Sequence, residues 1–502
     1  MNYKIIPDYL DHSAKLYPTK IAFADENREI TFSQVKDEAE RIAMGLINRG
    51  IRKKPVVIFM DKKVECINTM AGITYSGNFY TIVDVEMPIP RIEKILEILK
   101  PEVIITEGIH SENVAEFVGD AVVLLYEDLL KNDVDAIELA NVKNSIIDTD
   151  VLYVLFTSGS TGTPKGVIIS HKAVIAYLEW GANTFELNED TIFGNQTPFY
   201  FVMSGFDIYQ TLRNGCTMYI IPKTVFSFPL NLLKYMKEKK INTIFWVPSI
   251  LCLVANYRAL PEIHLDDLKI VMFGGEVMPT KQLNMWRKEY PEVQFVNQYG
   301  PTEMTDICAY YIVDRELSDS ESLPIGKPSN HMEIFLLDEQ DNIVEDGEVG
   351  ELCGRGPSLA YGYYNEPQKT DEVFVQNPLN NSYPEKIYRT GDLVRYNERG
   401  ELIYISRKDF QIKHMGNRIE LGEIETAVSS VEGIDMNCCL YDMKRSKIVL
   451  FYVGTKEEKA LIKQLEELLP KYMVPNKNVK LEQMPMNLNG KIDRAKLKEM
   501  LG

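Results

Sequence analysis

The sequence lacks the features of a disulfide-stabilised or zinc-binding protein. Its seven cysteines are scattered and odd in number, and none forms a Cys-x-x-Cys pair. Neither a disulfide framework nor a zinc site is therefore indicated, and reduced thiols in the cytoplasm are expected. The chain also has no apolar run of the length that a signal peptide or a membrane-spanning helix needs, so we expect no membrane association.

Positive charge is also scarce. The formal net charge is −18 at pH 7, which argues against a nucleic-acid-binding surface and against an anionic membrane face. A local basic loop can still bind a nucleotide, because charges more than ~10 Å away are largely screened. The composition thus excludes nucleic-acid partners but leaves nucleotide ligands open.

The length predicts more than one domain. A chain of 502 residues exceeds a single hydrophobic core, and 45% apolar with 25% charged residues is typical of a globular protein. Strand patterns such as 55–60 and 101–106 alternate with helical ones, among them a helix through Leu46 that we expect Ser33 to cap. This alternation predicts a largely parallel α/β sheet, and short strands with turns past residue 330 predict a β-rich subdomain.

One loop organises the chain. Apolar runs at 151–156 and 167–169 are typical of two buried strands, and a segment rich in Ser, Thr, Gly and one lysine joins them. Glycine allows backbone N–H groups to surround phosphate oxygens, and Lys165 adds a positive charge. The spacing is not that of Walker A, since no Gly-Lys-Ser/Thr precedes a helix. A Ser/Gly-rich surface turn is the alternative interpretation.

Further motifs follow this loop in a fixed order. They are Asn-Gln-Tyr-Gly-Pro-Thr-Glu at 297–303, Tyr-Arg-Thr-Gly-Asp-Leu at 388–393, Gly-Asn-Arg-Ile-Glu-Leu-Gly-Glu-Ile-Glu at 416–425, Pro-Lys-Tyr-Met-Val-Pro at 470–475 and Asn-Gly-Lys-Ile-Asp-Arg at 489–494. With them the whole chain resembles the adenylate-forming enzymes, specifically the adenylation domains of nonribosomal peptide synthetases and the D-alanine–carrier protein ligases. A single motif would be weak, but the ordered set is specific.

The resemblance implies both a fold and a reaction. The implied fold is α/β, with a large N-terminal domain of layered sheets plus a distorted β-barrel and a small mobile C-terminal α+β domain. We expect residues 1–408 to form the adenylation core and residues 409–502 to form the mobile domain. The implied reaction joins a carboxylic acid to ATP with Mg²⁺, giving an acyl-adenylate, and then transfers the acyl group to a thiol.

The resemblance also assigns residues to the nucleotide. It implies that the phosphates are held by Thr157, Ser158, Gly159, Ser160, Thr161, Gly162 and Lys165. It implies that the adenosine and α-phosphate are contacted by Gly275, Glu276, Asn297, Tyr299, Gly300, Thr302, Asp392 and Arg407. In this scheme Tyr299 stacks on adenine, Asp392 accepts both ribose hydroxyls, and Glu303 binds Mg²⁺, a hard cation that prefers oxygen ligands.

Two further residues are implied to act in catalysis. Lys491 resembles the family lysine that bridges the carboxylate and the α-phosphate, and Asp409 resembles the hinge about which the small domain rotates. The alternative for Lys491 is an ordinary exposed lysine. Ser406 stands where the family usually has glycine, which affects the expected hinge geometry only.

The implied acid pocket departs from that of amino-acid-activating relatives. Its lining residues would be Phe201, Val202, Met203, Phe206, Ser249, Met272, Gly274, Gln298, Asp306 and Ile307. Val202 stands where those relatives have an aspartate that pairs with the substrate α-ammonium. An unpaired buried ammonium would cost roughly 3–5 kcal/mol, or two to nearly four decades of affinity. A substrate without an α-amino group is therefore expected.

The identity of the acid stays open at this point. Gly205 and Gly274 leave space, and the neighbouring side chains are mostly apolar, so an aryl acid such as a hydroxybenzoate fits best. Ser249, Gln298 or Asp306 would then lie near its hydroxyl. Asp306 instead allows an amine at a distal position, as in a β-amino or aminobenzoic acid, or it faces away from the pocket. A D-alanine-like substrate is a further alternative.

The acceptor thiol is also open. The chain ends soon after Lys491, so we expect a phosphopantetheinyl carrier protein acting in trans. An acyl-coenzyme A ligase is the alternative enzyme, and a catalytically silent nucleotide-binding relative is the alternative from another class. Lys491, Glu303 and Asp392 are all present, which favours an active enzyme.

Overall fold

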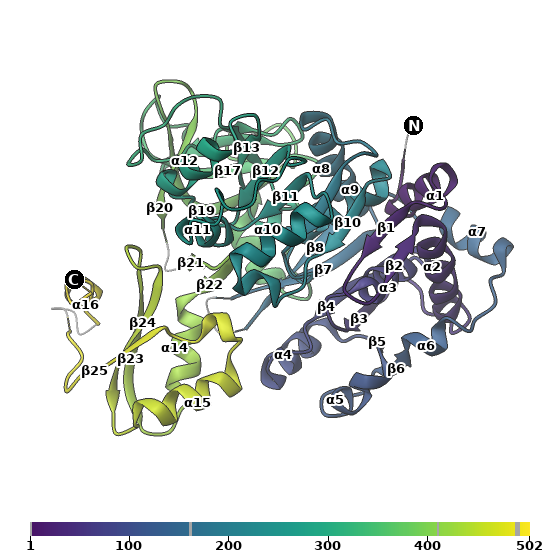
Figure 1. Ribbon diagram of the computed structural model, residues 1–502. Helices are drawn as coiled ribbons and strands as arrows, with labels where there is room; N and C mark the ends of the chain where they lie inside the picture. The colour runs from purple at the N-terminus through teal and green to yellow at the C-terminus, as the bar shows by residue number, and fades with distance from the viewer. Residues whose placement is uncertain (1–2, 160–162, 409–410, 487–491, 502) are drawn as a thin grey trace. The chain divides into compact units, whose positions relative to one another are not determined.

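The computed structural model describes residues 3–159, 163–408, 411–486 and 492–501. It divides into two compact units (Figure 1). The core unit consists of Met1–Val85, Leu99–Leu155 and Gly166–Lys408. The second unit consists of Glu86–Ile98, Phe156–Lys165 and Asp409–Gly502. A mobile C-terminal domain stays a prediction.

The larger sheet of the core unit is mostly parallel. Its nine strands run in the order β15-β14-β13-β12-β11-β9-β10-β1-β2, with antiparallel pairs only toward its two edges. The strands are β1 (Ile21–Ala24), β2 (Glu29–Thr31), β9 (Ile192–Asn195), β10 (Thr217–Ile220), β11 (Thr243–Trp246), β12 (Ile270–Gly274), β13 (Gln294–Tyr299), β14 (Ala309–Ile312) and β15 (Lys327–Pro328). The predicted α/β class is confirmed.

A second, six-stranded sheet has the order β6-β5-β3-β4-β7-β8. Its strands are β3 (Pro55–Phe59), β4 (Phe79–Val83), β5 (Val103–Thr106), β6 (Val122–Leu125), β7 (Val151–Thr157) and β8 (Lys165–Ser170). The strands predicted on either side of the Ser/Thr/Gly loop are thus confirmed as β7 and β8. The strand expected at 101–106 begins two residues later, at Val103, the first residue paired with both neighbouring strands, β3 and β6.

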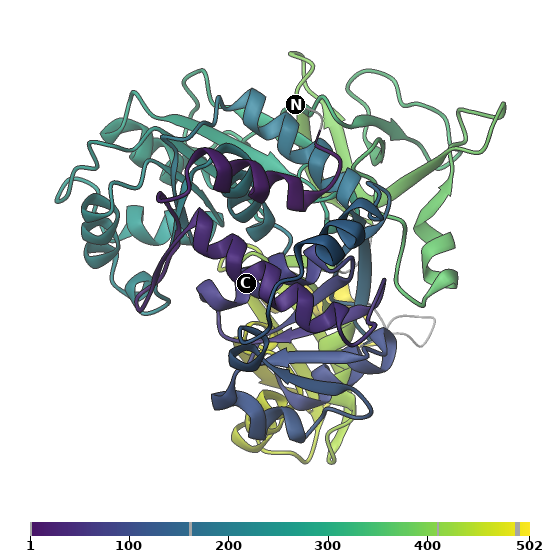
Figure 2. The same ribbon diagram turned by 90° about the vertical axis from the view of Figure 1, so that its right-hand side faces the viewer.

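Helices of the core unit cover these sheets. They are α1 (Ile6–Leu16), α2 (Phe32–Ile47), α3 (Val64–Tyr75), α5 (Ser111–Ala115), α6 (Tyr126–Leu129), α7 (Ala136–Asn144), α8 (His171–Thr184), α9 (Ser204–Asn214), α10 (Pro229–Glu238), α11 (Pro248–Asn256), α12 (Thr280–Glu289) and α13 (Pro367–Val373). The purple helices α1 and α2 lie side by side in Figure 2. One buried cluster joins side chains of both sheets, such as Ile58, Phe193 and Met272, into a common core.

The helix expected to be capped by Ser33 is capped two residues earlier. The side chain of Thr31 accepts a hydrogen bond from the backbone N–H of Gln34, and the Gln34 side chain accepts one from the N–H of Thr31. This reciprocal pair is a capping box. The prediction of Ser33 was wrong because Ser33 already lies inside the first turn of α2.

The predicted β-rich region is an antiparallel sheet that follows the nine-stranded sheet in the chain. Its strands are β16 (Glu333–Leu337), β17 (Gly350–Arg355), β18 (Phe374–Gln376), β19 (Lys386–Tyr396) and β20 (Leu402–Arg407). In the second unit, α4 (Ile89–Leu99) contributes Arg91, which forms a buried ion pair with Glu423. The other elements of this unit are β21 (Gln411–His414), β22 (Asn417–Glu420), α14 (Leu421–Ser429), β23 (Ile434–Asp442), β24 (Lys447–Gly454), α15 (Glu458–Leu468), β25 (Lys477–Lys480) and α16 (Arg494–Glu499).

Short 3-10 helices complete the fold. They are Gly108–His110, Val225–Ser227, Thr302–Met304 and Lys471–Met473. Within the described residues, no helix combines the length and the apolar character that crossing a membrane requires.

Candidate active site

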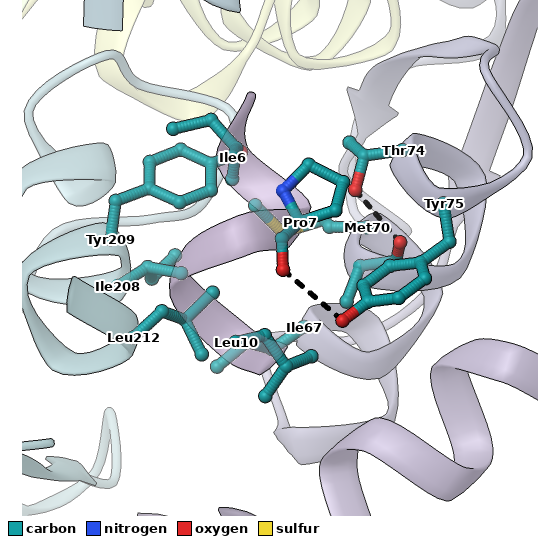
Figure 3. A pocket seen from close by; sticks show the side chains of 11 residues that line it. Ile6, Pro7, Leu10, Ile67, Met70, Thr74, Tyr75, Ile208, Tyr209 and Leu212 are labelled. Atoms are coloured by element: carbon teal, nitrogen blue, oxygen red, sulfur yellow. Dashed lines mark hydrogen bonds between the residues drawn. The ribbon is translucent and has the colours of Figure 1, made fainter. Parts of the chain in front are cut away.

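A small cavity between α1, α3 and α9 is too small to be the active site (Figure 3). Its volume is about 10 Å³, and its lining is almost entirely apolar. Such a space holds one water molecule at most. The Tyr75 hydroxyl donates to the Pro7 carbonyl at 3.2 Å beside it, so the polar group at its edge is satisfied within the chain.

The loop predicted to hold phosphate begins where β7 ends. Thr157 Oγ1 is buried and has no hydrogen-bond partner among the described residues, which leaves it available to a ligand. Ser158 Oγ donates to the Arg418 carbonyl at 2.5 Å and accepts from the Glu420 N–H at 3.2 Å. The Lys165 ammonium lies 4.0 Å from a Glu420 carboxylate oxygen. Ser158 and β22 both belong to the second unit, and within that unit the Ser158 hydroxyl is already hydrogen-bonded to β22.

The turn of this loop requires glycine at position 159. A Cβ atom added to Gly159 would lie 1.9 Å from the Thr163 carbonyl oxygen, so no other residue fits without moving the backbone. Ser160, Thr161 and Gly162, which were also predicted to hold phosphate, lie outside the described residues. The same is true of Asp409 and Lys491.

The predicted magnesium ligand is deeply buried. Glu303 lies in the 3-10 helix Thr302–Met304 and is 0% exposed. Its carboxylate accepts a hydrogen bond from the Tyr363 hydroxyl at 2.7 Å. A carboxylate is a hard oxygen donor and so suits Mg²⁺ chemically. Tyr363 was not predicted, since it lies 60 residues away in the sequence and belongs to no recognised motif.

The residues predicted to bind the ribose form a buried network. One oxygen of Asp392 accepts from Arg407 at 2.6 Å, and the other accepts from the Tyr299 hydroxyl. The antiparallel register of β19 and β20 sets Asp392 opposite Arg407. Burial beside this carboxylate raises the pKa of Tyr299 well above its usual value. Each carboxylate oxygen still has a lone pair for a further donor, so ligand hydroxyls can be accommodated.

The residues predicted near adenine lie at the ends of β12 and β13. Gly275 follows β12, and the neighbouring Glu276 carboxylate accepts from the Ser249 N–H at 2.9 Å. The side chain of Asn297 donates to the Pro324 carbonyl at 2.7 Å. Gly300 directly follows Tyr299, the last residue of β13. The carboxyl ends of neighbouring parallel strands meet at one sheet edge, as expected for a ligand site in such folds.

The residues predicted to line the acid pocket come from five parts of the core unit. They are Phe201, Val202 and Met203 before α9, Phe206 on α9, Ser249 on α11, Met272, Gly274 and Gln298 on β12 and β13, and Asp306 and Ile307 after the 3-10 helix. Phe206 and Met272 are 0% exposed, and Val202 is partly exposed and packs against the core. Most of the lining is therefore apolar.

The close approach of β12 and β13 explains why a glycine stands at position 274. Gly274 lies opposite Gln298 in the register of β12 and β13, and an added Cβ would lie 2.8 Å from the Gln298 carbonyl oxygen. Glycine is thus needed at Gly274 for close strand approach, whereas at Gly205 an added Cβ would make only ordinary contact with Tyr209. Extra room for substrate at Gly274 stays a prediction.

Polar groups of the predicted pocket remain without partners. Both side-chain amide atoms of Gln298 are buried and make no hydrogen bond with the described residues. Leaving such groups unpaired is costly, so a ligand or water that supplies partners would be favoured. Gln298 can both donate and accept, as a substrate hydroxyl requires.

Asp306 has a partner that sequence reasoning missed. The Tyr177 hydroxyl, on α8, donates to its carboxylate at 2.7 Å, and both residues are buried. The Tyr177 ring lies 5.4 Å from that of Phe206, so two predicted pocket residues meet around it. Asp306 has a φ of 75°, which is unusual for a residue other than glycine and marks a constrained turn. The helical pattern around Tyr177 gave no functional signal.

The fold is shared with solved structures of known enzymes. A nonribosomal peptide synthetase protein with adenylation and carrier domains, PA1221, matches with a TM-score of 0.85 at 23% identity, over 99% of this chain and 84% of that chain. The amide bond synthetase McbA from Marinactinospora thermotolerans matches with a TM-score of 0.85 at 18% identity, over 99% of each chain. The predicted adenylate-forming fold is confirmed.

Sequence relatives define the family more closely. The AMP-binding enzyme family model matches residues 10–364. Tyrocidine synthase 1 of Brevibacillus parabrevis is 32% identical over 99% of this chain, which spans only 45% of that protein. The D-alanine–D-alanyl carrier protein ligase of Bacillus licheniformis is 30% identical over 97% of both chains. This chain therefore belongs to the AMP-binding enzymes, and the predicted resemblance and enzymatic class are confirmed.

Proposed function

We propose that this enzyme activates an aryl acid without an α-amino group and transfers it to a thiol. The apolar Val202, at the place of the ammonium-binding aspartate in amino-acid-activating relatives, carries the proposal. The buried Phe206 and Met272 and the unpaired amide of Gln298 support a flat acid with a polar substituent. A hydroxybenzoate is the best match to this combination.

The first half-reaction is an adenylation. A carboxylate oxygen of the acid bonds to the α-phosphorus of ATP, the bond between the α- and β-phosphates breaks, and pyrophosphate leaves. The phosphate loop and Lys165 would hold the departing phosphates, and Lys491 would bridge the carboxylate and the α-phosphate. Such a reaction depends on positioning and charge stabilisation rather than on a protein nucleophile.

Protein side chains would fix the nucleotide at its other end. Asp392, held by Tyr299 and Arg407, would accept the ribose hydroxyls, and Thr302 would contact the α-phosphate. Glu303 would hold Mg²⁺, which neutralises phosphate charge when bound.

The second half-reaction transfers the acyl group. The acceptor sulfur bonds to the acyl carbon, the bond to AMP breaks, and the thiol proton passes to solvent. We propose a phosphopantetheinyl carrier protein as acceptor, because carrier protein ligases are among the relatives aligned over nearly their full length. Coenzyme A is the alternative.

A second substrate class is favoured by one contact. Asp306 lies in the core and is oriented by Tyr177, so its carboxylate would pair with an amine distal to the reacting acid. Aminobenzoic or β-amino acids would use this feature. D-Alanine is the other alternative, since its ligases are similar over nearly the whole chain.

Acid-dependent pyrophosphate release tests the proposal. The full chain is incubated with ATP, Mg²⁺, hydroxylamine and one acid at a time, using hydroxybenzoates, aminobenzoates, β-alanine, D-alanine and the twenty standard amino acids. We expect turnover with benzoates and none with α-amino acids. Turnover with D-alanine and none with benzoates would overturn the substrate assignment. Adding coenzyme A or a purified carrier protein then identifies the acceptor by thioester formation.

A further inference from the structure

Lys62 contacts the start of the segment that carries the acid-pocket residues. It lies between β3 and α3, and its ammonium donates to the Gln196 carbonyl at 2.8 Å and to the Asn195 carbonyl at 3.4 Å. The same ammonium lies 5.7 Å from the centre of the Phe199 ring, within range of a cation–π contact. The Lys62 side chain thus contacts three residues, Asn195, Gln196 and Phe199, within a stretch of five.

The segment itself leads directly into the pocket. Residues 196–203 connect β9 to α9 and include Phe201, Val202 and Met203, which are predicted to line the acid. Inside the segment, the Phe201 N–H donates to the Pro198 carbonyl at 3.1 Å, and Ser204 Oγ donates to the Phe201 carbonyl at 2.7 Å. These local bonds shape the turn but do not anchor it to the six-stranded sheet. Lys62 supplies a polar anchor of this kind, because it follows β3 of that sheet.

Asp207 also contacts Asn195, the residue at the end of β9, but through the Asn195 side chain. It lies on α9, one helical turn after Met203, and is 1% exposed. Its Oδ2 atom accepts from the Asn195 side chain at 2.9 Å. Asn195 therefore receives a hydrogen bond from Lys62 at its carbonyl and donates one to Asp207 from its amide. The end of β9 is held from both sides.

The charges make this network sensitive to substitution. Burial lowers the pKa of Lys62 to about 7, and the charge of Asp207 opposes that shift. Burial likewise raises the pKa of Asp207 to about 7, with Asn195 and Lys62 opposing it and Asp306 adding to it. Burying Lys62 and Asp207 costs solvation free energy. The hydrogen bonds that the two side chains make to the end of β9 have to compensate for this cost.

We propose that Lys62 is a positioning residue for the acid pocket, acting through Asn195, Gln196 and Phe199. This inference about Lys62 rests on the proposed function in one respect, because the proposed function takes residues 196–203 to contact the acid. Lys62 then governs the Michaelis constant for the acid and leaves that for ATP nearly unchanged.

Three variants test the proposal. Lys62→Met removes the donor and the charge, and Lys62→Arg restores both. Lys63→Met is the matched control, because the neighbouring Lys63 pairs with Glu107 and not with the segment. Steady-state pyrophosphate release and hydrogen–deuterium exchange of peptides covering residues 196–203 are measured for each variant.

We expect Lys62→Met to raise KM for the acid about tenfold or more, the loss typical of one charged hydrogen bond. KM for ATP should change less than about twofold, and exchange in 196–203 should accelerate. Lys62→Arg should recover most of both effects, and Lys63→Met should resemble the wild type. An equal rise in both KM values, or unchanged exchange in Lys62→Met, would overturn the proposal.

The exchange experiment separates this inference from the proposed function. If the wild type turned over no acid in the panel, the proposed function would fail. Exchange in residues 196–203 would still decide whether Lys62 holds the segment.

Discussion

The residues of the core unit predicted to bind the nucleotide (the nucleotide end) and those predicted to line the acid (the acid pocket) differ in how their polar groups are satisfied. At the nucleotide end, Asp392 is already hydrogen-bonded to Tyr299 and Arg407, and Glu303 is bonded to Tyr363. In the acid pocket, both amide atoms of Gln298 lack partners among the described residues. The first set of side chains is already held by hydrogen bonds within the chain, and the second leaves buried polar atoms that a ligand could satisfy.

Under the proposed function, this difference would separate the residues that speed the reaction from those that select the acid. Groups held in place before binding pay no reorganisation cost during the reaction, which favours charge stabilisation. Buried groups that only the right ligand satisfies penalise a wrong one, which favours selectivity. We therefore expect substitutions at the nucleotide end to slow every acid equally, and substitutions in the pocket to change the ranking of acids.

The largest effect is expected for Lys491→Ala. Loss of the proposed bridge to the α-phosphate should reduce adenylation by about a thousandfold for every acid, measured by pyrophosphate release. Thioester formation from a supplied acyl-adenylate should be spared. Equal losses in both half-reactions would contradict the bridging role.

The next largest effect is expected for Val202→Asp. A carboxylate here would offer an α-ammonium its missing counter-charge, so kcat/KM for α-amino acids relative to aryl acids should rise about a hundredfold or more. The measurement is the ratio of the two values in one assay series, with Val202→Asn as the isosteric uncharged control. An unchanged ratio would mean that Val202 does not face the substrate carboxyl end.

A smaller and uniform effect is expected for Asp392→Asn. The substitution removes a charge that two neighbours hold in place and leaves the half-buried Arg407 without its anion. kcat/KM for ATP should fall roughly a hundredfold, and the order of preferred acids should stay the same. A changed order of acids would show that the two ends are not independent.

The smallest effect is expected for Tyr177→Phe. It removes the hydroxyl that orients Asp306 while keeping the ring beside Phe206. KM for hydroxyl- or amino-substituted benzoates should change by about tenfold, the value of one hydrogen bond, and that for unsubstituted benzoate should change less. Equal changes for all three acids would indicate a packing role only.

The sequence gives a clearer signal for the predicted nucleotide residues than for the predicted pocket residues, and the reason is physical, although the roles of both sets stay predictions. Phosphate and ribose impose the same chemical demands wherever a nucleotide binds, so residues with the roles predicted for Gly159, Glu303 and Asp392 would be expected in short recognisable motifs. The strands around the Ser/Thr/Gly loop could be predicted because their apolar runs end at the turn residues.

The remaining features depend on contacts between distant residues. Tyr177 and Asp306 are 129 positions apart, and Lys62 lies 134 positions from Gln196. Nothing in the local pattern of α8 or in the turn after β3 signals these contacts. The cap of α2 was misplaced for a smaller reason, since Thr31 and Ser33 are both common cap residues and only the backbone distinguishes them.

The central claim is that the acid pocket has no counter-charge for an α-amino group. It is tested most directly by comparing 3-phenylpropanoate with D- and L-phenylalanine, which differ from it only in that group, as substrates of the wild-type enzyme. Our account predicts that kcat/KM in acid-dependent pyrophosphate release is at least about a hundredfold higher for the desamino acid. A preference for either phenylalanine would contradict it.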